Sequence, residues 1–366
     1  MKYKNIVYIF LIAIIIKIVY IFTAVFILKN TIDYSNFNTF IGDIFFRWDS
    51  HKYYSLIING YPHSSPEILA EKDHIWAFFP LYPGIISVLM KIFSLSFNTA
   101  AFFWSLVSSL AAFLGIYWFC NIYFNNTKKS LFITILFLFL PFSYYFSAFL
   151  TESTFLLLLI FSFISIYKKK YFIFSILSSL LVLVRANGML SVFILFLFFL
   201  ENKGIISGYF RFNFSIKKEL VIKSLFFVPP VLVFLCYCLY QYYMTGDFFA
   251  FSTVQKAWGR TGGIPHDFII FRIPLALLSL FLFVYFLNVK KNQLSFTLMI
   301  ILNLLLPIST GTFGSIPRYS CTLFPLYIIV GNAVNNTKIK WLIVALTFSI
   351  QIYYYILWLK LSFVTA

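Results

Sequence analysis

Asp49 lies in the most polar stretch of the chain, GDIFFRWDSHKYYSLIINGY, which covers residues 42–61. Trp48 precedes it directly and His51 follows two residues later. A carboxylate that is partly withdrawn from water can have a raised pKa and take a proton from a hydroxyl group. Aspartate before a run of helix formers is also a common N-cap, and the bare sequence favours this simpler role. Asp49 is therefore a candidate for either.

A second acidic candidate is Glu152, in the segment PFSYYFSAFLTES at residues 141–153. This segment separates two apolar runs. Ionisable side chains near membrane depth are candidates for function. A carboxylate at the start of a helix is also favoured by the helix dipole alone, and the sequence does not decide between the two interpretations.

Three arginines accompany these carboxylates. Arg185 is the only charge between residues 171 and 200, Arg318 lies in SIPRY, and Arg260 ends the loop segment TGDFFAFSTVQKAWGR. Guanidinium groups are well suited to bind phosphate. Arg185 could instead extend to the membrane interface, and Arg260 could belong to an ordinary solvated loop. Arg318 at a helix start opposes the helix dipole, so an anionic partner is expected.

This mixture of groups suits a sugar carried on a lipid phosphate. The polyprenyl tail needs apolar grooves, the phosphate needs cations, and the incoming hydroxyl needs a base. A phosphodiester leaves as a weakly basic anion, so cations that stabilise it suffice. The sequence has no G-x-x-x-x-G-K-[ST] loop, which argues against an ATP-driven pump. It also lacks a D-x-D pair, so a sugar nucleotide is a less favoured donor. The four cysteines form no zinc pattern, and we assign no metal or other cofactor.

The composition predicts which elements position these side chains. Of the 366 residues, 61% are hydrophobic and only 11% are charged. A soluble domain carries about 25% charged residues, and lipid accepts so much apolar surface most readily as helices that close their own backbone hydrogen bonds. The sequence therefore predicts an all-α polytopic membrane protein. The net charge of +17 fits lysines on cytosolic loops better than nucleic-acid binding.

The apolar runs predict about eleven spans in one domain that covers residues 1–366. A long first loop, residues 30–99, carries interfacial helices, and residues 77–96 are predicted to lie at the interface because Pro80, Pro83, Gly84 and Lys91 interrupt them. Residues 171–185 and 189–201 form either one bent span or a re-entrant pair. The predicted spans are 5–29, 100–124, 130–148, 152–167, 171–185, 189–201, 225–244, 269–288, 293–309, 319–334 and 339–359.

With residues 77–96 at the interface, the basic loops 125–129 and 168–170 face the cytosol, as the positive-inside rule prefers. Nine of the eleven carboxylates then fall on or beside the outer side. Acidic residues contribute little to orientation, so this clustering indicates an extracytoplasmic site.

The order of RWDSHKYYSLIINGY, AFFPLYP, PFSYYFSAFLTESTF, VRANG and PRY resembles that of the PIG-V-like mannosyltransferases over roughly residues 40–325. The resemblance implies a GT-C glycosyltransferase, with a carboxylate on the first outer loop, that inverts the sugar of a polyprenyl- or dolichyl-phosphate mannose donor. Asp49 matches the carboxylate of the WD motif, Glu152 its acidic turn, and Arg185 and Asn187 its R-x-N-G motif. The acceptor is then a glycan or glycolipid. The membrane is the inner or plasma membrane in a prokaryote and the endoplasmic reticulum in a eukaryote.

We assign the remaining roles with this chemistry in view. Asp49 and Glu152 are the catalytic candidates, with Glu152 orienting the acceptor or a cation, and Arg185, Arg318 and Arg260 hold the donor phosphate. Trp48, Tyr53 and Tyr82 could stack on sugar rings or could equally belong to a belt of aromatic residues at the membrane interface. A transporter or flippase of lipid-linked sugars, a polymerase of such sugars and a non-catalytic scaffold are the alternatives. The predicted substrate contacts are Trp48, His51, Tyr53, Tyr82, Asn187 and Gln255.

Overall fold

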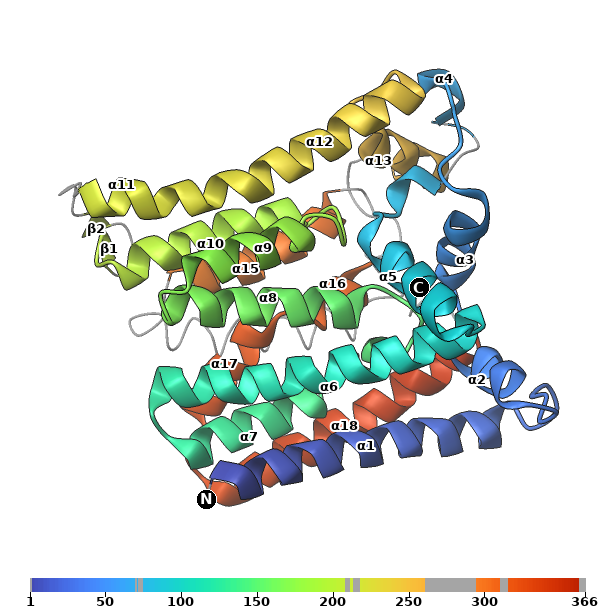
Figure 1. Cartoon of the computed structure of the whole chain (residues 1–366). Helices are drawn as coiled ribbons and strands as arrows, with labels where there is room; N and C mark the ends of the chain where they lie inside the picture. Colours follow the sequence, from blue (N-terminus) through green and yellow to red (C-terminus); the bar gives the residue numbers. More distant parts are fainter. Residues whose placement is uncertain are drawn as a thin grey trace.

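The computed structural model describes residues 2–69, 71, 75–207, 211–212, 218–260, 294–309 and 315–361. In these ranges the chain is helical apart from its connections and one hairpin, whose two strands have two residues each. The prediction of an all-α polytopic membrane protein is therefore confirmed. Figure 1 shows the long helices stacked side by side. They are α1 (Lys2–Ile27), α6 (Phe97–Phe124), α7 (Thr127–Leu138), α8 (Glu152–Tyr167), α9 (Tyr171–Leu181), α10 (Gly188–Asn202), α12 (Val228–Thr245), α15 (Leu294–Ile308), α17 (Phe324–Ala333) and α18 (Thr337–Leu359).

Four helical stretches of the described residues are long and apolar enough to cross a membrane: Tyr3–Ile27, Phe97–Phe124, Lys218–Thr245 and Thr337–Leu359. The third joins α11 (Lys218–Ser224), η3 (Leu225–Phe227) and α12. The other apolar helices are shorter, and the predicted span 269–288 lies outside the described residues. Large apolar side chains on the outer faces of α1 and α12 are exposed, as lipid contact requires.

Short elements gather at one end of the bundle (Figure 1). The 13 residues of α5 (Leu81–Phe93) extend about 20 Å, which is too short to cross a bilayer, and the helix lies across this end. The position of residues 77–96 at the membrane interface stays a prediction. The other short elements are α2 (Phe37–Phe45), α3 (Ser50–Asn59), α4 (Pro66–Leu69), η1 (Ile75–Ala77), α13 (Ala250–Thr253), η4 (Val254–Trp258) and α16 (Ile316–Ser320). We call this the loop end.

The opposite end, which we call the lysine end, holds the N-terminus, the turn from α6 to α7 and the turn from α8 to α9 at Lys168–Lys170 (Figure 1). The hairpin of β1 (Ile206–Ser207) and β2 (Arg211–Phe212) lies there too. Asn125 ends α6 in a left-handed conformation, and the side chain of Asn126 caps α7. The basic turns and the first loop thus lie at opposite ends, as the charge pattern predicts. Which end faces the cytosol stays a prediction.

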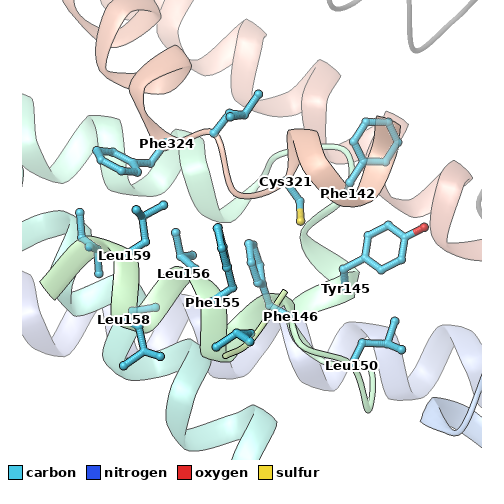
Figure 2. Packing of buried hydrophobic residues seen from close by; sticks show 14 of the residues in the cluster. Phe142, Tyr145, Phe146, Leu150, Phe155, Leu156, Leu158, Leu159, Cys321 and Phe324 are labelled. Atoms are coloured by element: carbon cyan, nitrogen blue, oxygen red, sulfur yellow. The ribbon is translucent and has the colours of Figure 1, made fainter. Parts of the chain in front are cut away.

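The predicted span 130–148 is wrong, because α7 ends at Leu138. Pro141 cannot donate a backbone hydrogen bond, and residues 139–151 follow an irregular path that includes η2 (Ser143–Phe146). The segment is nevertheless buried. Figure 2 shows Phe142, Tyr145, Phe146 and Leu150 in the apolar core with side chains of α8 and residues near the start of α17.

A buried irregular segment needs partners for its polar backbone groups, and other helices supply them. Gln351 of α18 donates from Nε2 to the carbonyls of Leu138 and Leu140, each at 3.0 Å. Lys17 of α1 donates to Ser147 Oγ at 2.9 Å, and the hydroxyls of Tyr20 and Ser143 lie 2.7 Å apart. Two helices that are remote in sequence therefore hold the segment that leads into Glu152.

Gln351→Leu is expected to lower the free energy of unfolding by about 1–3 kcal/mol, because it removes the side-chain donor of the Leu138 carbonyl and one of the two donors of the Leu140 carbonyl. Denaturant unfolding in detergent measures this loss. Ser349→Ala on the same helix is the control, since its exposed hydroxyl bonds only within the helix. Equal stability of the two variants would contradict the support that we assign to Gln351.

Two other spans differ from expectation. The predicted span 319–334 is interrupted, because α16 ends at Ser320 and α17 begins at Phe324, with Pro325 in its first turn. Of the two arrangements expected for residues 171–201, one bent span is wrong, and a pair of helices is found. The pair is α9 and α10, which run in opposite directions side by side and are joined at the loop end by residues 182–187 (Figure 1).

Candidate functional site

Asp49 occupies the position before α3, but its carboxylate does not cap that helix. It forms an ion pair with Arg318 through Oδ2 instead. The preceding residue, Trp48, has φ 54°, which non-glycine residues adopt rarely. Its carbonyl lies 2.5 Å from Nδ1 of His51, which helps to hold the turn. The simpler capping role of the side chain is therefore wrong, and the ion pair takes its place.

Arg318 connects Asp49 to a second carboxylate. Its Nε donates to Glu152 Oε1 at 2.7 Å, and Arg185 donates to the same oxygen from Nη1 at 3.1 Å. Four charged groups thus form one chain in the order Asp49, Arg318, Glu152 and Arg185. They come from the first loop, α16, the start of α8 and the turn between α9 and α10. The anionic partner that the sequence demanded for Arg318 is therefore this pair of carboxylates.

Burial differs along this chain of charges. The Glu152 side chain is fully buried, those of Arg185 and Arg318 are 11% and 13% exposed, and that of Asp49 is 32% exposed. Asp49 is thus the member that a substrate can reach most easily. Glu152 Oε2 and the hydroxyl of Thr151 are buried and have no hydrogen-bond partner within the described ranges. Unpaired buried oxygens are costly, so these two atoms are available as acceptors for a further hydrogen bond.

Aromatic residues pack around the guanidinium groups. The Arg185 guanidinium lies 4.8 Å from the centre of the Tyr319 ring, within the range of a cation–π contact. Tyr53 of α3 packs edge-on against Tyr82 of α5, with ring centres 4.9 Å apart. The Tyr82 side chain is buried, and its hydroxyl has no partner among the described residues. Sequence reasoning missed Tyr319, although it closes the PRY motif that contains Arg318.

Electrostatics favour protonated arginines at this site. Burial by itself would lower the pKa of Arg318, but Glu152 and Asp49 outweigh this effect and hold the pKa well above its usual value. The negative charges of Asp49 and Glu152 balance the positive charges of Arg185 and Arg318. Arg260 adds a positive charge nearby, and burial lowers its pKa while Tyr319 and Asp49 oppose the decrease. Arginine is protonated throughout the accessible pH range, so the site carries a net positive charge that suits an anion.

Arg260 is positioned by its own loop rather than by the carboxylates. It donates to Gln255 Oε1 at 2.6 Å and to Ser315 Oγ at 2.9 Å. Gln255, which we predicted to contact substrate, also donates to the carbonyl of Phe251. Its amide group is therefore used to anchor Arg260. Ser315 directly precedes α16, which carries Arg318. This contact therefore links the loop of Arg260 to Arg318.

Asn187 performs a packing role in the structure. Its side-chain nitrogen donates to Asn303 Oδ1 of α15 at 2.8 Å, and both side chains are buried. The bond joins the start of α10 to α15. We predicted that Asn187 contacts substrate. Its Oδ1 atom has no hydrogen-bond partner in the described part of the chain. His51 is exposed and Trp48 is half buried, and both lie next to Asp49.

The tight packing at Gly188 explains why the VRANG segment ends in glycine. A Cβ at this position would lie 2.5 Å from the carbonyl oxygen of Leu181 and 2.7 Å from Cα of Val182. Because both are backbone atoms, they cannot rotate away. Glycine thus lets the start of α10 approach the end of α9, and this contact holds Arg185 in the turn between them.

Gly188→Ala is expected to lower the free energy of unfolding by about 1–3 kcal/mol, because the added methyl group forces two backbone segments apart. We also expect the pairing of Arg185 with Glu152 to weaken, since Arg185 moves with the turn. Gly84→Ala is the matched control, because nothing lies within 4 Å of its added Cβ in α5. Thermal unfolding of both variants measures the difference. A Gly188→Ala protein as stable as Gly84→Ala would disprove the close approach.

The two carboxylates are held by arginines and not by metal-binding neighbours. Within the described ranges, no three His, Cys, Asp or Glu side chains gather in a way that could hold a metal ion. The described side chains place a partly exposed carboxylate beside a cluster of cations.

No family model matches this sequence, and no curated protein matches it. Among solved structures, the chain is similar to the archaeal oligosaccharyltransferase AglB from Archaeoglobus fulgidus, determined in complex with an inhibitory peptide and a dolichol-phosphate. The TM-score is 0.50 and the sequence identity is 11%, over 100% of this chain and 56% of the other. This chain thus spans about half the length of that enzyme. The likeness concerns the fold alone: the chain shares the helical arrangement of that structure and is an all-α integral membrane protein.

Proposed function

We propose that this protein is an inverting glycosyltransferase. It moves a sugar, for which we propose mannose, from a polyprenyl-phosphate donor to an acceptor hydroxyl. The observation that carries the proposal is the chain of charges Asp49, Arg318, Glu152 and Arg185, in which the most exposed group is a carboxylate and its neighbours are cations. The shared fold with an enzyme solved together with a dolichol-phosphate supports a lipid-phosphate donor.

In this proposal Asp49 is the general base. Its Oδ2 pairs with Arg318, while no described residue forms a hydrogen bond with Oδ1. Oδ1 accepts the proton of the acceptor hydroxyl as that oxygen attacks the anomeric carbon. The bond between the anomeric carbon and the phosphate oxygen breaks, and its electron pair stays on the phosphate. Because attack and departure occur on opposite faces of the sugar, the configuration inverts.

Arg318, Arg185 and Arg260 are proposed to hold the donor phosphate. Guanidinium groups stabilise the charge that develops on the leaving oxygen without donating a proton. Arg318 forms ion pairs with both carboxylates. A donor phosphate competes for its N–H groups and so loosens its hold on Asp49. Binding of the donor thereby frees the base for the acceptor.

Glu152 serves as the anchor of this arrangement. One oxygen accepts from both Arg318 and Arg185, so the two guanidinium groups are held on the same side of α8. Of the two roles expected for Glu152, orientation of a cation is the one that these contacts favour. Its removal would leave Arg185 without its carboxylate and Arg318 paired with Asp49 alone.

The test uses purified protein in lipid nanodiscs with polyprenyl-phosphate mannose labelled in the sugar and a panel of glycan and glycolipid acceptors. We expect the label to move to an acceptor and the anomeric configuration of the product to be opposite to that of the donor. An intact donor with every acceptor, or a product of retained configuration, would reject the proposal.

The main competing function is that of a transporter or flippase for lipid-linked sugars. It would use the same cations and apolar grooves but would need no base. Proteoliposomes with labelled donor on one side distinguish the two functions. A transporter moves the donor unchanged across the bilayer, whereas a transferase separates the sugar from its lipid.

A further inference from the structure

A separate cavity of about 760 Å³ lies beside the first loop, between the end of α1, helix α2 and the start of α6. Figure 1 shows these three segments meeting at the loop end. Neither Asp49, Glu152 nor any of the three site arginines lines it. Its volume falls within the range of about 300–1,000 Å³ that is typical of small-molecule sites. The base and the phosphate-binding groups proposed above thus lie outside its lining.

The lining of the cavity combines polar groups with aromatic rings. Phe46, Tyr54 and Phe97 pack against one another at one side, with ring centres 5.4–6.4 Å apart. Tyr54 is 44% exposed. Aromatic faces of this kind suit the apolar faces of a sugar ring, and the phenol also offers a polar edge.

The charges of the cavity disfavour ionic ligands. Asp33 and Asp43 face a single arginine, Arg47, which is engaged with the backbone carbonyl of Asp43. The formal balance is one negative charge, so phosphate and carboxylate groups are disfavoured. Backbone and hydroxyl contacts lower the pKa of Asp33, which keeps it ionised. A long apolar chain is disfavoured as well, because these charges would lose water without gaining partners.

The lining of the cavity retains both hydrogen-bond donors and acceptors that no described residue uses. No described residue bonds to Asp43 Oδ1 or Asn98 Oδ1, which are acceptors, or to Asn38 Nδ2 and the Tyr54 hydroxyl, which can donate. A ligand that matches such a lining must accept and donate at neighbouring atoms. Sugar hydroxyl groups do both, while ions and acyl chains do not.

The structure assigns this cavity to the neutral sugar rings of the acceptor. This assignment rests on the proposed function, because it names the acceptor of the same enzyme as a glycan or glycolipid. The cavity and the base are linked through one short turn. Arg47 lines the cavity, Asp49 follows two residues later, and the carbonyl of Arg47 accepts from Ser50 Oγ at 2.7 Å. This turn therefore joins the lining of the cavity to the proposed base.

The test measures sugar binding directly, by saturation-transfer NMR of the full protein in nanodiscs with mannobiose and with mannose 6-phosphate. We expect mannobiose to bind in preference to the phosphate. Tyr54→Ala and the isosteric Asp43→Asn should each weaken mannobiose binding about tenfold, which corresponds to about 1.4 kcal/mol. Tyr34→Ala, an exposed tyrosine of the same loop outside the cavity, is the matched control.

Kinetics separate this inference from the proposed function. In the transfer assay, both cavity variants should raise the acceptor KM and leave the donor KM unchanged. An unchanged acceptor KM with active transfer would overturn the sugar site while the transferase stands. If mannobiose binds through Tyr54 but no sugar is ever transferred, the site stands and the transferase falls. Preference for mannose 6-phosphate, or equal binding by all variants, would overturn the assignment.

Discussion

Asp49→Asn is expected to lower kcat for sugar transfer roughly 10²- to 10⁴-fold, the usual contribution of a general base. Asparagine has the same shape, and its amide oxygen can still accept from Arg318, so the protein should fold normally. Donor binding should persist because the arginines remain. Single-turnover transfer from labelled polyprenyl-phosphate mannose measures the chemical step apart from binding.

The control for Asp49→Asn is Glu67→Gln, which neutralises an exposed carboxylate of the same loop at the start of α4. It should transfer sugar at the wild-type rate. Transport of intact donor that survives Asp49→Asn would favour the flippase. Equal transfer by Asp49→Asn and wild type would remove Asp49 from the mechanism.

Arg318→Gln is expected to destabilise the fold strongly. It removes the partner of Asp49 and one of the two partners of the fully buried Glu152. Breaking a buried ion pair from one side costs about 3–5 kcal/mol. The loss here should lie near 3 kcal/mol, because Arg185 still compensates Glu152 and solvent reaches Asp49. Denaturant unfolding in detergent measures it.

Two further variants show how Arg318 acts. Arg318→Lys keeps the charge but loses the planar fork, so it should fold, raise the donor KM and lower kcat. The double variant of Asp49→Asn with Arg318→Gln should lose less stability than the sum of its parts, because the unpaired carboxylate is gone. Lys128→Gln, an exposed change at the lysine end, should stay within about 0.5 kcal/mol of wild type. Strict additivity would mean that Asp49 and Arg318 are not coupled.

The sequence by itself determined the class of protein and the residues that meet at the loop end. Low charge and long apolar runs require lipid and therefore helices, whatever their packing. A charged side chain within an apolar run costs free energy, so the few that occur are expected to pair with one another. This is why Asp49, Glu152, Arg185 and Arg318 could be selected before any contact was known. The mannose donor and the side of the membrane are still predictions.

Only the tertiary structure decided how these residues pair and where the helices break. Asp49 and Arg318 are 269 residues apart, and Arg318 and Glu152 are 166 apart, so no local pattern shows that the carboxylate binds an arginine instead of capping α3. The end of α7 at Leu138 likewise depends on Gln351, a residue 211–213 positions away that satisfies the freed carbonyls. The partner of Asn187 on α15 and the cavity beside α2 arise in the same way. Hydropathy reports what each side chain avoids, whereas these contacts depend on which distant groups the folded chain brings within hydrogen-bonding distance.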